Sequence, residues 1–265
     1  MARPVTTFLR AAGDPLVDLG GYLVGVASIT GEVLLSVVGA GGRIRPVVRD
    51  VLWRQVYFTA VTAVPFTALL ALLVALAVAA QSPYSAAAGG NVLGTILVAA
   101  LVRELAPITA ATIVIARSGT AMAAELATMR VEGEVDALAG MGIAPFEYLV
   151  VPRVVGTAVA LASLTVVFLA VSLGASAALS PLLGGPPPGD IVDLVANALR
   201  PADAAALAAK TVIPGMAVAA VACQEGLRAS RSTTQIPPAA TAAVVRSFSL
   251  VFVWNTAVTA LLYLT

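Results

Sequence analysis

Long apolar stretches without formal charge constrain this chain more than any other feature. The clearest one runs from Val56 to Ala80 and contains no Asp, Glu, Lys or Arg. A helix needs about 20 apolar residues to cross the hydrocarbon core of a bilayer, so this stretch is long enough. The 265-residue chain is 60% hydrophobic and only 11% charged, whereas soluble domains carry about 25% charged residues. The sequence therefore predicts an all-α integral membrane protein.

Five segments are predicted to span the membrane, separated by polar or turn-forming sequence. In chain order they cover residues 56–80, 92 to about 128, 154 to about 183, 204–225 and 242–264. The second is too long for one straight crossing, so its C-terminal end should project from the bilayer. We therefore expect a transmembrane domain over residues 51–265, preceded by a cytoplasmic or interfacial helical segment over residues 1–50.

Within the N-terminal segment, residues 15–42 are long enough to form a sixth span. Their leucines and valines can share one stripe, whereas the polar residues fall elsewhere: Asp18, Ser28, Glu32 and Ser36. This pattern favours an amphipathic helix that lies in the membrane interface. A sixth span remains the alternative.

Basic residues predict the orientation of the spans, because cytoplasmic loops carry an excess of Lys and Arg. Arginines cluster before the first span, on either side of the segment between spans two and three, and between spans four and five. They are Arg43, Arg45, Arg49, Arg54, Arg130, Arg153, Arg228 and Arg231. The other two connections contain a single arginine, Arg200. Five crossings then place the N-terminus in the cytoplasm and the C-terminus outside.

The residue inventory limits the chemistry that this chain can perform. It has no histidine, one cysteine (Cys223) and one lysine (Lys210), which argues against a metalloenzyme or a Ser-His hydrolase. The sequence has no Gly-x-x-x-x-Gly-Lys-Ser/Thr phosphate loop, so ATP cannot bind by that route. We therefore expect no catalytic residue, no metal and no cofactor in this chain. If transport is powered by ATP, a partner chain must bind ATP and Mg²⁺.

An acidic island interrupts the apolar sequence. Residues 125–147 hold five of the fourteen acidic residues. Apolar side chains at i, i+4 and i+7 predict a helix over about 130–142. Glu132 and Asp136 would stand one turn apart on it, at a cost of a few tenths of a kcal/mol that a cationic partner would offset. The segment is either a solvated loop helix or a helix that docks into a partner protein.

Four ionisable residues fall inside the predicted spans: Arg103, Glu104, Arg117 and Lys210. Each costs about 2.5–3.5 kcal/mol at membrane depth, so each should face protein or water. We predict that Glu104 and Lys210 meet and join spans two and four. Arg103 and Arg117 should lie close to the same helix face. Either this pairing is purely structural, or these residues act in gating or contact a lipid head group.

A series of short motifs fills residues 103–156. In order they are Arg-Glu-Leu-Ala-Pro, Ala-Arg-Ser-Gly, Ala-Glu-Leu-Ala-Thr-Met-Arg, Asp-Ala-Leu, Met-Gly-Ile-Ala-Pro and Tyr-Leu-Val-Val-Pro-Arg. Together they closely resemble the MlaE/YrbE family of ABC transporter permeases, which serve Mce-type lipid transport systems. The chain departs from the family pattern at residues 228–245, where a glycine-rich stretch is usual, and at Asn255, where an aspartate is common.

The resemblance implies an MlaE-like permease fold, with an interfacial N-terminal helix and five transmembrane helices, in a bacterial cytoplasmic (inner) membrane. It implies a second permease copy or paralogue, a pair of cytoplasmic ATPases that bind ATP and Mg²⁺, and an Mce-domain partner that carries lipid outside the membrane. The acidic island is then the coupling helix. The residues expected to contact the ATPase are Arg130, Glu132, Glu134, Asp136 and Leu138.

The leading interpretation is a permease subunit, not an enzyme, that passes lipid between the membrane and an Mce partner. For an apolar groove that holds a lipid tail, we name four residues of spans one and five: Leu70, Leu73, Phe248 and Val251. Two alternatives stay open, namely an ion-coupled secondary carrier that uses Glu104 and Lys210, and a non-transporting scaffold for an Mce complex. The odd number of spans and the lack of an inverted repeat argue against the carrier.

Overall fold

The computed structural model describes residues 22, 24–36, 46–80, 97–230 and 232–264. The chain divides into two compact units, Met1–Ile44 and Arg45–Thr265. In the first unit, a short apolar helix covers Val24–Ser36. The choice between an interfacial helix and a sixth span for residues 15–42 falls largely outside the described residues.

Among the described residues, five helical segments are long and apolar enough to cross a membrane, and no strand is present. They cover Asp50–Ala79, Val98–Glu132, Phe146–Leu179, Pro201–Arg228 and Thr233–Leu262. This confirms the predicted all-α membrane fold with five spans. The third span begins at Phe146 rather than at the predicted Val154. The prediction began too late because two charged residues precede Val154. One of them, Glu147, is exposed, and the other, Arg153, forms an ion pair.

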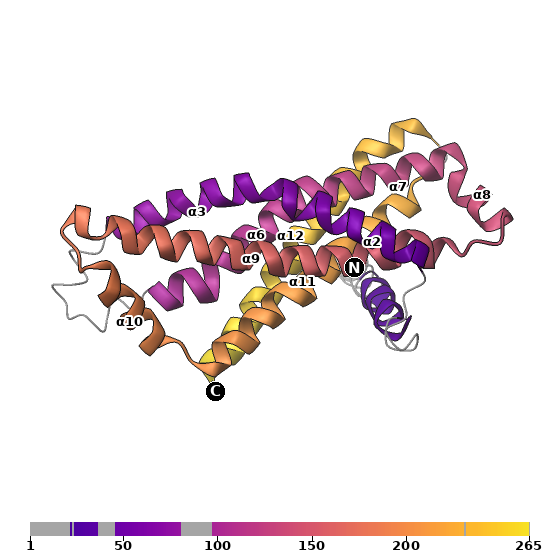
Figure 1. Cartoon of the computed structure of the whole chain (residues 1–265). Helices are drawn as coiled ribbons and strands as arrows, with labels where there is room; N and C mark the ends of the chain where they lie inside the picture. Colours follow the sequence, from indigo (N-terminus) through magenta and orange to yellow (C-terminus); the bar gives the residue numbers. More distant parts are fainter. Residues whose placement is uncertain (1–21, 23, 37–45, 81–96, 231, 265) are drawn as a thin grey trace, which may run out of the picture. The chain divides into compact units, whose positions relative to one another are not determined.

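Each span is built from shorter helical elements, most of which Figure 1 labels. The first contains α2 (Pro46–Thr59), the 3-10 turn η1 (Val61–Ala63) and α3 (Val64–Ala79). The second contains the π-helical stretch η2 (Val98–Leu105), α6 (Ala106–Val114), a second π-helical stretch η3 (Ile115–Gly119) and α7 (Thr120–Glu132). The third contains the π-helical stretch η4 (Phe146–Val150) and α9 (Val151–Leu179). The fourth is α11 (Pro201–Arg228), and the fifth contains η6 (Thr233–Gln235) and α12 (Ile236–Leu264).

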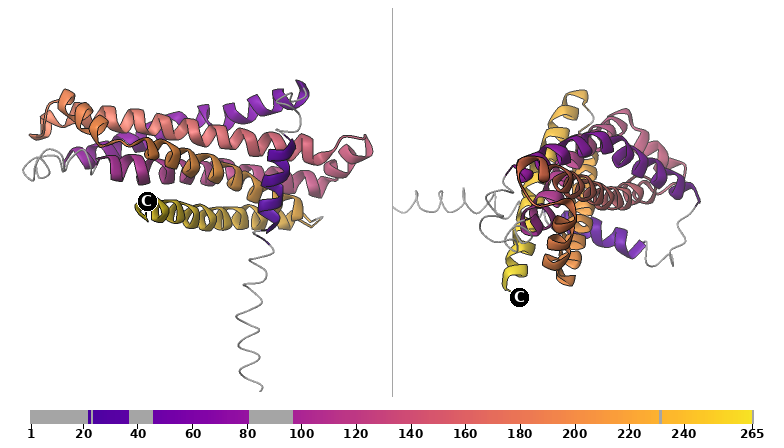
Figure 2. Two further views of the ribbon diagram at one scale, coloured as in Figure 1. Left: turned by 90° about the horizontal axis from the view of Figure 1, so that it is seen from below. Right: turned by 60° about the vertical axis from the view of Figure 1, so that its left-hand side comes forward.

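Helices α9 and α11 form the centre of the second unit. They pack against each other, α9 also contacts α2 and α3, and α11 contacts α7 and α12 (Figure 2). A Cβ added to Gly215 of α11 would lie 2.7 Å from the Cα of Ala158 in α9. A Cβ added to Gly226 would lie 2.8 Å from the carbonyl oxygen of Ala123 in α7. Small residues thus let these helices approach closely, which is the usual basis of helix packing in membranes.

Two of the π-helical stretches end two residues before a proline. Pro107 follows η2, and Pro152 follows η4. Proline has no N–H, and its ring clashes with the carbonyl group four residues earlier in an α-helix. A wider π turn relieves this conflict. The prolines therefore account for local irregularities in the second and third spans.

The acidic island forms two helices rather than one. Gly133 has a φ of 81° and ends α7, and α8 (Glu134–Gly140) begins directly after it. Glycine adopts this left-handed conformation readily and commonly ends helices. The prediction of one continuous helix over residues 130–142 is therefore wrong. Glu132 and Asp136 lie on different helices instead of one turn apart.

The sequence also did not predict α10 (Pro188–Ala198), a helix in the connection between spans three and four. Its Ile191 and Val195 are buried at i and i+4, in a cluster that includes Leu97 and Leu101 of the second span. A helix of 11 residues is too short to cross a bilayer. Hydropathy therefore gives no sign of it, although its apolar residues follow helical spacing.

Candidate functional site

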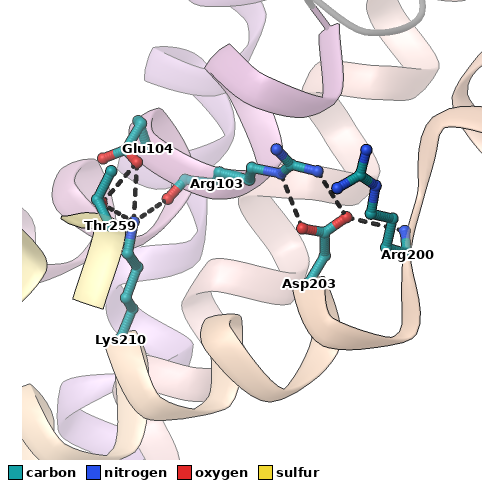
Figure 3. Close-up of polar contacts among 6 residues, drawn as sticks. All are labelled: Arg103, Glu104, Arg200, Asp203, Lys210 and Thr259. Atoms are coloured by element: carbon teal, nitrogen blue, oxygen red, sulfur yellow. Dashed lines mark hydrogen bonds and ion pairs between the residues drawn. The ribbon is translucent and has the colours of Figure 1, made fainter. Parts of the chain in front are cut away.

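A network of ion pairs and hydrogen bonds joins the second, fourth and fifth spans (Figure 3). Its centre is Lys210 of α11, whose side chain is 1% exposed. Lys210 Nζ donates to Glu104 Oε1 at 2.9 Å, to the Arg103 carbonyl at 2.6 Å and to Thr259 Oγ1 at 2.6 Å. An ammonium group has three donors, so these acceptors satisfy all of them. The predicted contact between Glu104 and Lys210 is confirmed.

Pro107 explains why the Arg103 carbonyl is available to Lys210. In a regular α-helix, the N–H of residue 107 would donate to the carbonyl of residue 103. Proline has no N–H to donate, and Lys210 supplies a donor from a neighbouring helix. The backbone carbonyl left without a donor in the second span and the buried ammonium group of the fourth span therefore satisfy each other.

A second ion pair lies beside the first (Figure 3). Arg103 Nε is 2.7 Å from Asp203 Oδ1, and Arg103 Nη2 donates to Asp203 Oδ2 at 3.2 Å. The Asp203 side chain is 1% exposed, and its Oδ2 also accepts the backbone N–H of Arg200 at 2.8 Å. Asp203 and Lys210 are seven residues apart on α11, so they lie two turns apart on one face. The adjacent residues Arg103 and Glu104 thus each meet their own partner.

The network is electrically neutral. Arg103 and Lys210 contribute two positive charges, and Glu104 and Asp203 contribute two negative charges. The hydroxyl of Thr259 on α12 also donates to Glu104 Oε1 at 2.8 Å. Removing one member of a buried ion pair typically costs about 3–5 kcal/mol. The network therefore holds three spans together, and its involvement in gating stays a prediction.

Two members of the network, Asp203 and Thr259, are not among the residues that the sequence singles out. Asp203 lies just before the predicted fourth span, 204–225, and is assigned there to the connection. The signal that identifies Asp203 is its position seven residues before Lys210, which places both side chains on one helix face. An acid and a base on that face complement the base and the acid at Arg103 and Glu104. Thr259 gives no such signal, since a threonine within a helix often bonds to the backbone of its own helix.

Arg117, the fourth predicted intramembrane residue, lies apart from this network. It lines a cavity of about 440 Å³ together with residues of α2, α7 and α9. Arg103 contacts α11 instead, so the two arginines face different helices, although the sequence places them close to one face. The π-helical stretch η3, which contains Arg117, contributes to this difference because a π turn shifts the register of the residues around the helix axis.

The structure separates the predicted coupling residues into two groups. Glu132 and Glu134 are exposed. Asp136 is also exposed, but it forms an ion pair with Arg130, with 2.7 Å between Oδ1 and Nη1. Leu138 is partly buried. The carboxylates of Glu132 and Glu134 are therefore the most open to a partner, whereas the Asp136 carboxylate helps to hold α8 against the end of α7.

The residues named for a lipid groove do not form one surface. Val251 is 3% exposed and lies in a core cluster with residues of the second, third and fourth spans. Leu70 and Phe248 are partly buried against the same cluster. Leu73 is 54% exposed. Val251 is thus a core residue rather than part of a groove, because apolar character alone does not distinguish a core position from a lipid-facing one.

Comparison with known protein families gives a match over almost the whole second unit. The family described as Permease MlaE matches residues 52–261. The matched region begins in the first span and ends in the fifth. The similarity therefore covers the complete bundle, including both helices of the acidic island.

Several relatives show the same similarity. The chloroplastic protein TRIGALACTOSYLDIACYLGLYCEROL 1 of Arabidopsis thaliana is 34% identical over 161 residues, 61% of this chain and 46% of that protein. A "Probable ABC transporter permease protein" of Synechocystis is 34% identical over 163 residues, 62% of this chain and 62% of that protein. A protein of the same description from Rickettsia prowazekii is 29% identical over 230 residues, 82% of this chain and 85% of that protein. The matched region covers less than two thirds of the length of the first two relatives.

Proposed function

The chain belongs to the MlaE permease family, and on this premise we propose that it passes lipid between the cytoplasmic membrane and an Mce-domain protein outside it. The observation that carries the proposal is the family match over residues 52–261, because it covers the five-span bundle rather than one motif. The chain is a multi-pass ABC transporter permease, and therefore a transport subunit rather than a catalytic enzyme. A separate ATPase drives the movement of lipid.

An ABC transporter permease works as one of a pair, beside an ATPase on another chain. We expect the second permease to be an identical copy or a paralogue. The ATPase pair would bind ATP and Mg²⁺, because this sequence has no phosphate-binding loop of its own. The complete assembly then contains two permeases, two ATPases and an Mce-domain protein.

Two features support lipid as the cargo. The name of the Arabidopsis relative contains trigalactosyldiacylglycerol, which is a glycolipid. The first span also exposes a row of large apolar side chains: Phe66, Leu69, Leu72, Leu73 and Leu76. On a membrane span, such side chains favour contact with acyl chains or with another apolar helix.

The exposed end of the acidic island supports a coupling role. Glu132 and Glu134 present carboxylates, and Met141 and Ile143 are 67% and 40% exposed. Val135 is buried and anchors α8. Carboxylates beside exposed apolar side chains suit docking into a cationic groove with an apolar floor. We assign this end of the bundle to the cytoplasm because arginines accumulate in the connections there. Membership of the MlaE family favours a bacterial inner membrane.

Charge reversal in the complete transporter tests this proposal. The double variant Glu132→Lys, Glu134→Lys is compared with Asp190→Lys, Asp193→Lys, which reverses two exposed carboxylates on α10. We expect ATP hydrolysis, and transfer of a fluorescent lipid to the Mce-domain protein, to fall about tenfold in the first variant, because reversed charges oppose a cationic groove. The α10 variant should retain both activities.

Two results would contradict the proposed function. The first is unchanged hydrolysis and transfer in the Glu132→Lys, Glu134→Lys variant. The second is lipid transfer that continues at full rate without the ATPase. That second result would favour an ion-coupled carrier that uses Glu104 and Lys210, or a scaffold that supports transport by another chain.

A further inference from the structure

A cavity of about 440 Å³ lies between α2, the junction of η3 and α7, and α9. Its charged lining residues are Arg54, Arg117, Glu125 and Arg153, and Gln55, Thr59 and Ser118 add neutral polar groups. Its volume is within the range of about 300–1,000 Å³ that is usual for small-molecule sites. None of the residues that line the cavity belongs to the neutral network, so the cavity requires its own explanation.

The cavity has more positive charge than the protein neutralises. Three guanidinium groups and one carboxylate line it, which leaves a formal charge of +2 (three minus one). Glu125 Oε1 is 3.0 Å from Arg153 Nη2 and balances one of the three. The guanidinium groups of Arg54 and Arg117 form no hydrogen bond or ion pair with any residue that the structure describes.

Arg153 is the strongest sign that the cavity is a ligand site. Its side chain is 8% exposed, and although Nη1 donates to the Leu149 carbonyl at 2.9 Å, Nε has no partner among the described residues. Buried polar groups are nearly always hydrogen-bonded. An anion in the cavity would satisfy this donor and neutralise the remaining charge.

The arrangement of the three guanidinium groups favours a phosphate group as the ligand. Guanidinium groups bind phosphate through two parallel N–H donors. Arg54, Arg117 and Arg153 approach from three different elements. Three such groups suit a tetrahedral anion with several oxygens better than a carboxylate, which has only two.

The neighbouring surface favours a lipid as the source of that phosphate. Arg54 and Phe58 also line a second hollow of about 740 Å³, together with Trp53, Tyr57 and Val61. This hollow is mainly apolar and aromatic, and it shares two residues with the basic cavity. A molecule with a phosphate head and an apolar tail can occupy both at once.

We propose that the basic cavity binds the phosphate group of an anionic phospholipid, whose acyl region lies along α2 beside Trp53. The proposal deepens the proposed function by naming a class of lipid. The role of the bound lipid in transport rests on the proposed function, whereas its binding does not. Binding itself is a property of this chain. A simpler explanation is diffuse attraction of anionic lipid by basic residues near the membrane surface. The two explanations differ in which residues matter.

Binding can be measured through Trp53 in the full-length chain. The chain has two tryptophans, so a Trp254→Phe background makes Trp53 the sole reporter. The protein is reconstituted in vesicles of digalactosyldiacylglycerol, which has no phosphate. Increasing fractions of brominated phosphatidylglycerol are added, and quenching of Trp53 gives the half-saturating fraction. Brominated diacylglycerol, which lacks the phosphate, should quench only in proportion to its overall concentration.

Two variants with opposite expected effects on the half-saturating fraction distinguish binding in the cavity from diffuse attraction. Arg117→Gln should raise the half-saturating fraction about tenfold, because it removes a charged donor to phosphate. Glu125→Gln should lower it several-fold, because it removes the only negative charge in the cavity. The matched control is Arg228→Gln, an exposed arginine at the end of α11 that does not line the cavity. It should leave the half-saturating fraction unchanged.

Equal effects of Arg117→Gln and Arg228→Gln would overturn the proposal, as would an unchanged half-saturating fraction in Glu125→Gln. Complete displacement of the brominated lipid by millimolar inorganic phosphate would overturn the lipid assignment, because free phosphate would then be sufficient. No ATPase or Mce-domain protein is present in this measurement. Its failure is therefore distinguishable from failure of the proposed transport function.

Discussion

Two charged regions of this bundle use similar residues in opposite ways. In the neutral network, Arg103 and Lys210 are matched by Glu104 and Asp203, and each donor of Lys210 Nζ has an acceptor. In the basic cavity, three arginines share one carboxylate. In the first region each charge faces an opposite charge, whereas the second has unused donors and surplus charge. The balance of donors and acceptors, rather than the presence of charge, therefore separates a structural site from a candidate ligand site.

The largest expected effect comes from removing the centre of the neutral network. Lys210→Met leaves Glu104 and the Arg103 carbonyl without their main partner, and should lower the free energy of unfolding by about 3–5 kcal/mol. Arg117→Met, in the basic cavity, should change stability by less than about 1 kcal/mol because Arg117 has no ion pair among the described residues. Unfolding of both variants in detergent, followed by circular dichroism, measures the difference.

A double variant shows whether the loss arises from an unpaired charge. Lys210→Met combined with Glu104→Gln should recover most of the lost stability, because the buried pair is then replaced by neutral groups. If Lys210→Met is as stable as Arg117→Met, the network does not hold the spans together and the comparison fails.

The next largest effect on stability comes from adding a methyl group to glycines that pack beside the two regions. Gly215→Ala places a Cβ 2.7 Å from the backbone of α9, and should cost about 1–3 kcal/mol because backbone cannot move aside. Gly156→Ala meets the side chain of Gln55, which lines the basic cavity, at 2.8 Å. We expect a smaller loss there, since a side chain can rotate.

Gly174→Ala on α9 is the control for these glycine variants. A Cβ there has nothing within 4 Å, so the variant should be neutral or should gain up to about 1 kcal/mol from helix propensity. Thermal unfolding of the three variants gives their order of stability. A loss at Gly156→Ala equal to that at Gly215→Ala would mean that the cavity wall is as rigid as the core.

The smallest expected effect is the response to salt. Raising the salt concentration from about 0.1 M to about 1 M shortens the Debye length from about 10 Å to about 3 Å. Phosphatidylglycerol binding at the exposed Arg54 and Arg117 should weaken several-fold. The melting temperature should change little, because Lys210 and Asp203 are buried. A large fall in melting temperature with unchanged binding would reverse the assignment of the two regions.

The sequence predicts the spans well because hydropathy and helical length are local properties. It also predicts the contact between Glu104 and Lys210, since charges at membrane depth need partners. It does not predict the break at Gly133, because the apolar spacing on both sides also fits one helix. Asp203 lies at the boundary of a span, where hydropathy does not distinguish a loop residue from a buried first turn.

The basic cavity marks the limit of prediction from sequence. Arg54 precedes the first predicted span, Arg117 lies inside the second, and Arg153 stands just before the third. Sequence patterns assign them to different roles: Arg54 and Arg153 to orientation, and Arg117 to the membrane interior. Only the packing of α2, α7 and α9 brings the three together, with Glu125 as their single counter-charge.

The amino-acid sequence by itself determined that this chain is helical, that it has five segments long and apolar enough to cross a membrane, and that its intramembrane charges must face protein or water. These features depend on the free energy of moving short segments from water into lipid, which each segment sets almost independently. The tertiary structure decided which charges are matched and which remain open. That outcome depends on helix neighbours and on register, which prolines and π-helical stretches shift, so residues distant in the sequence determine it together.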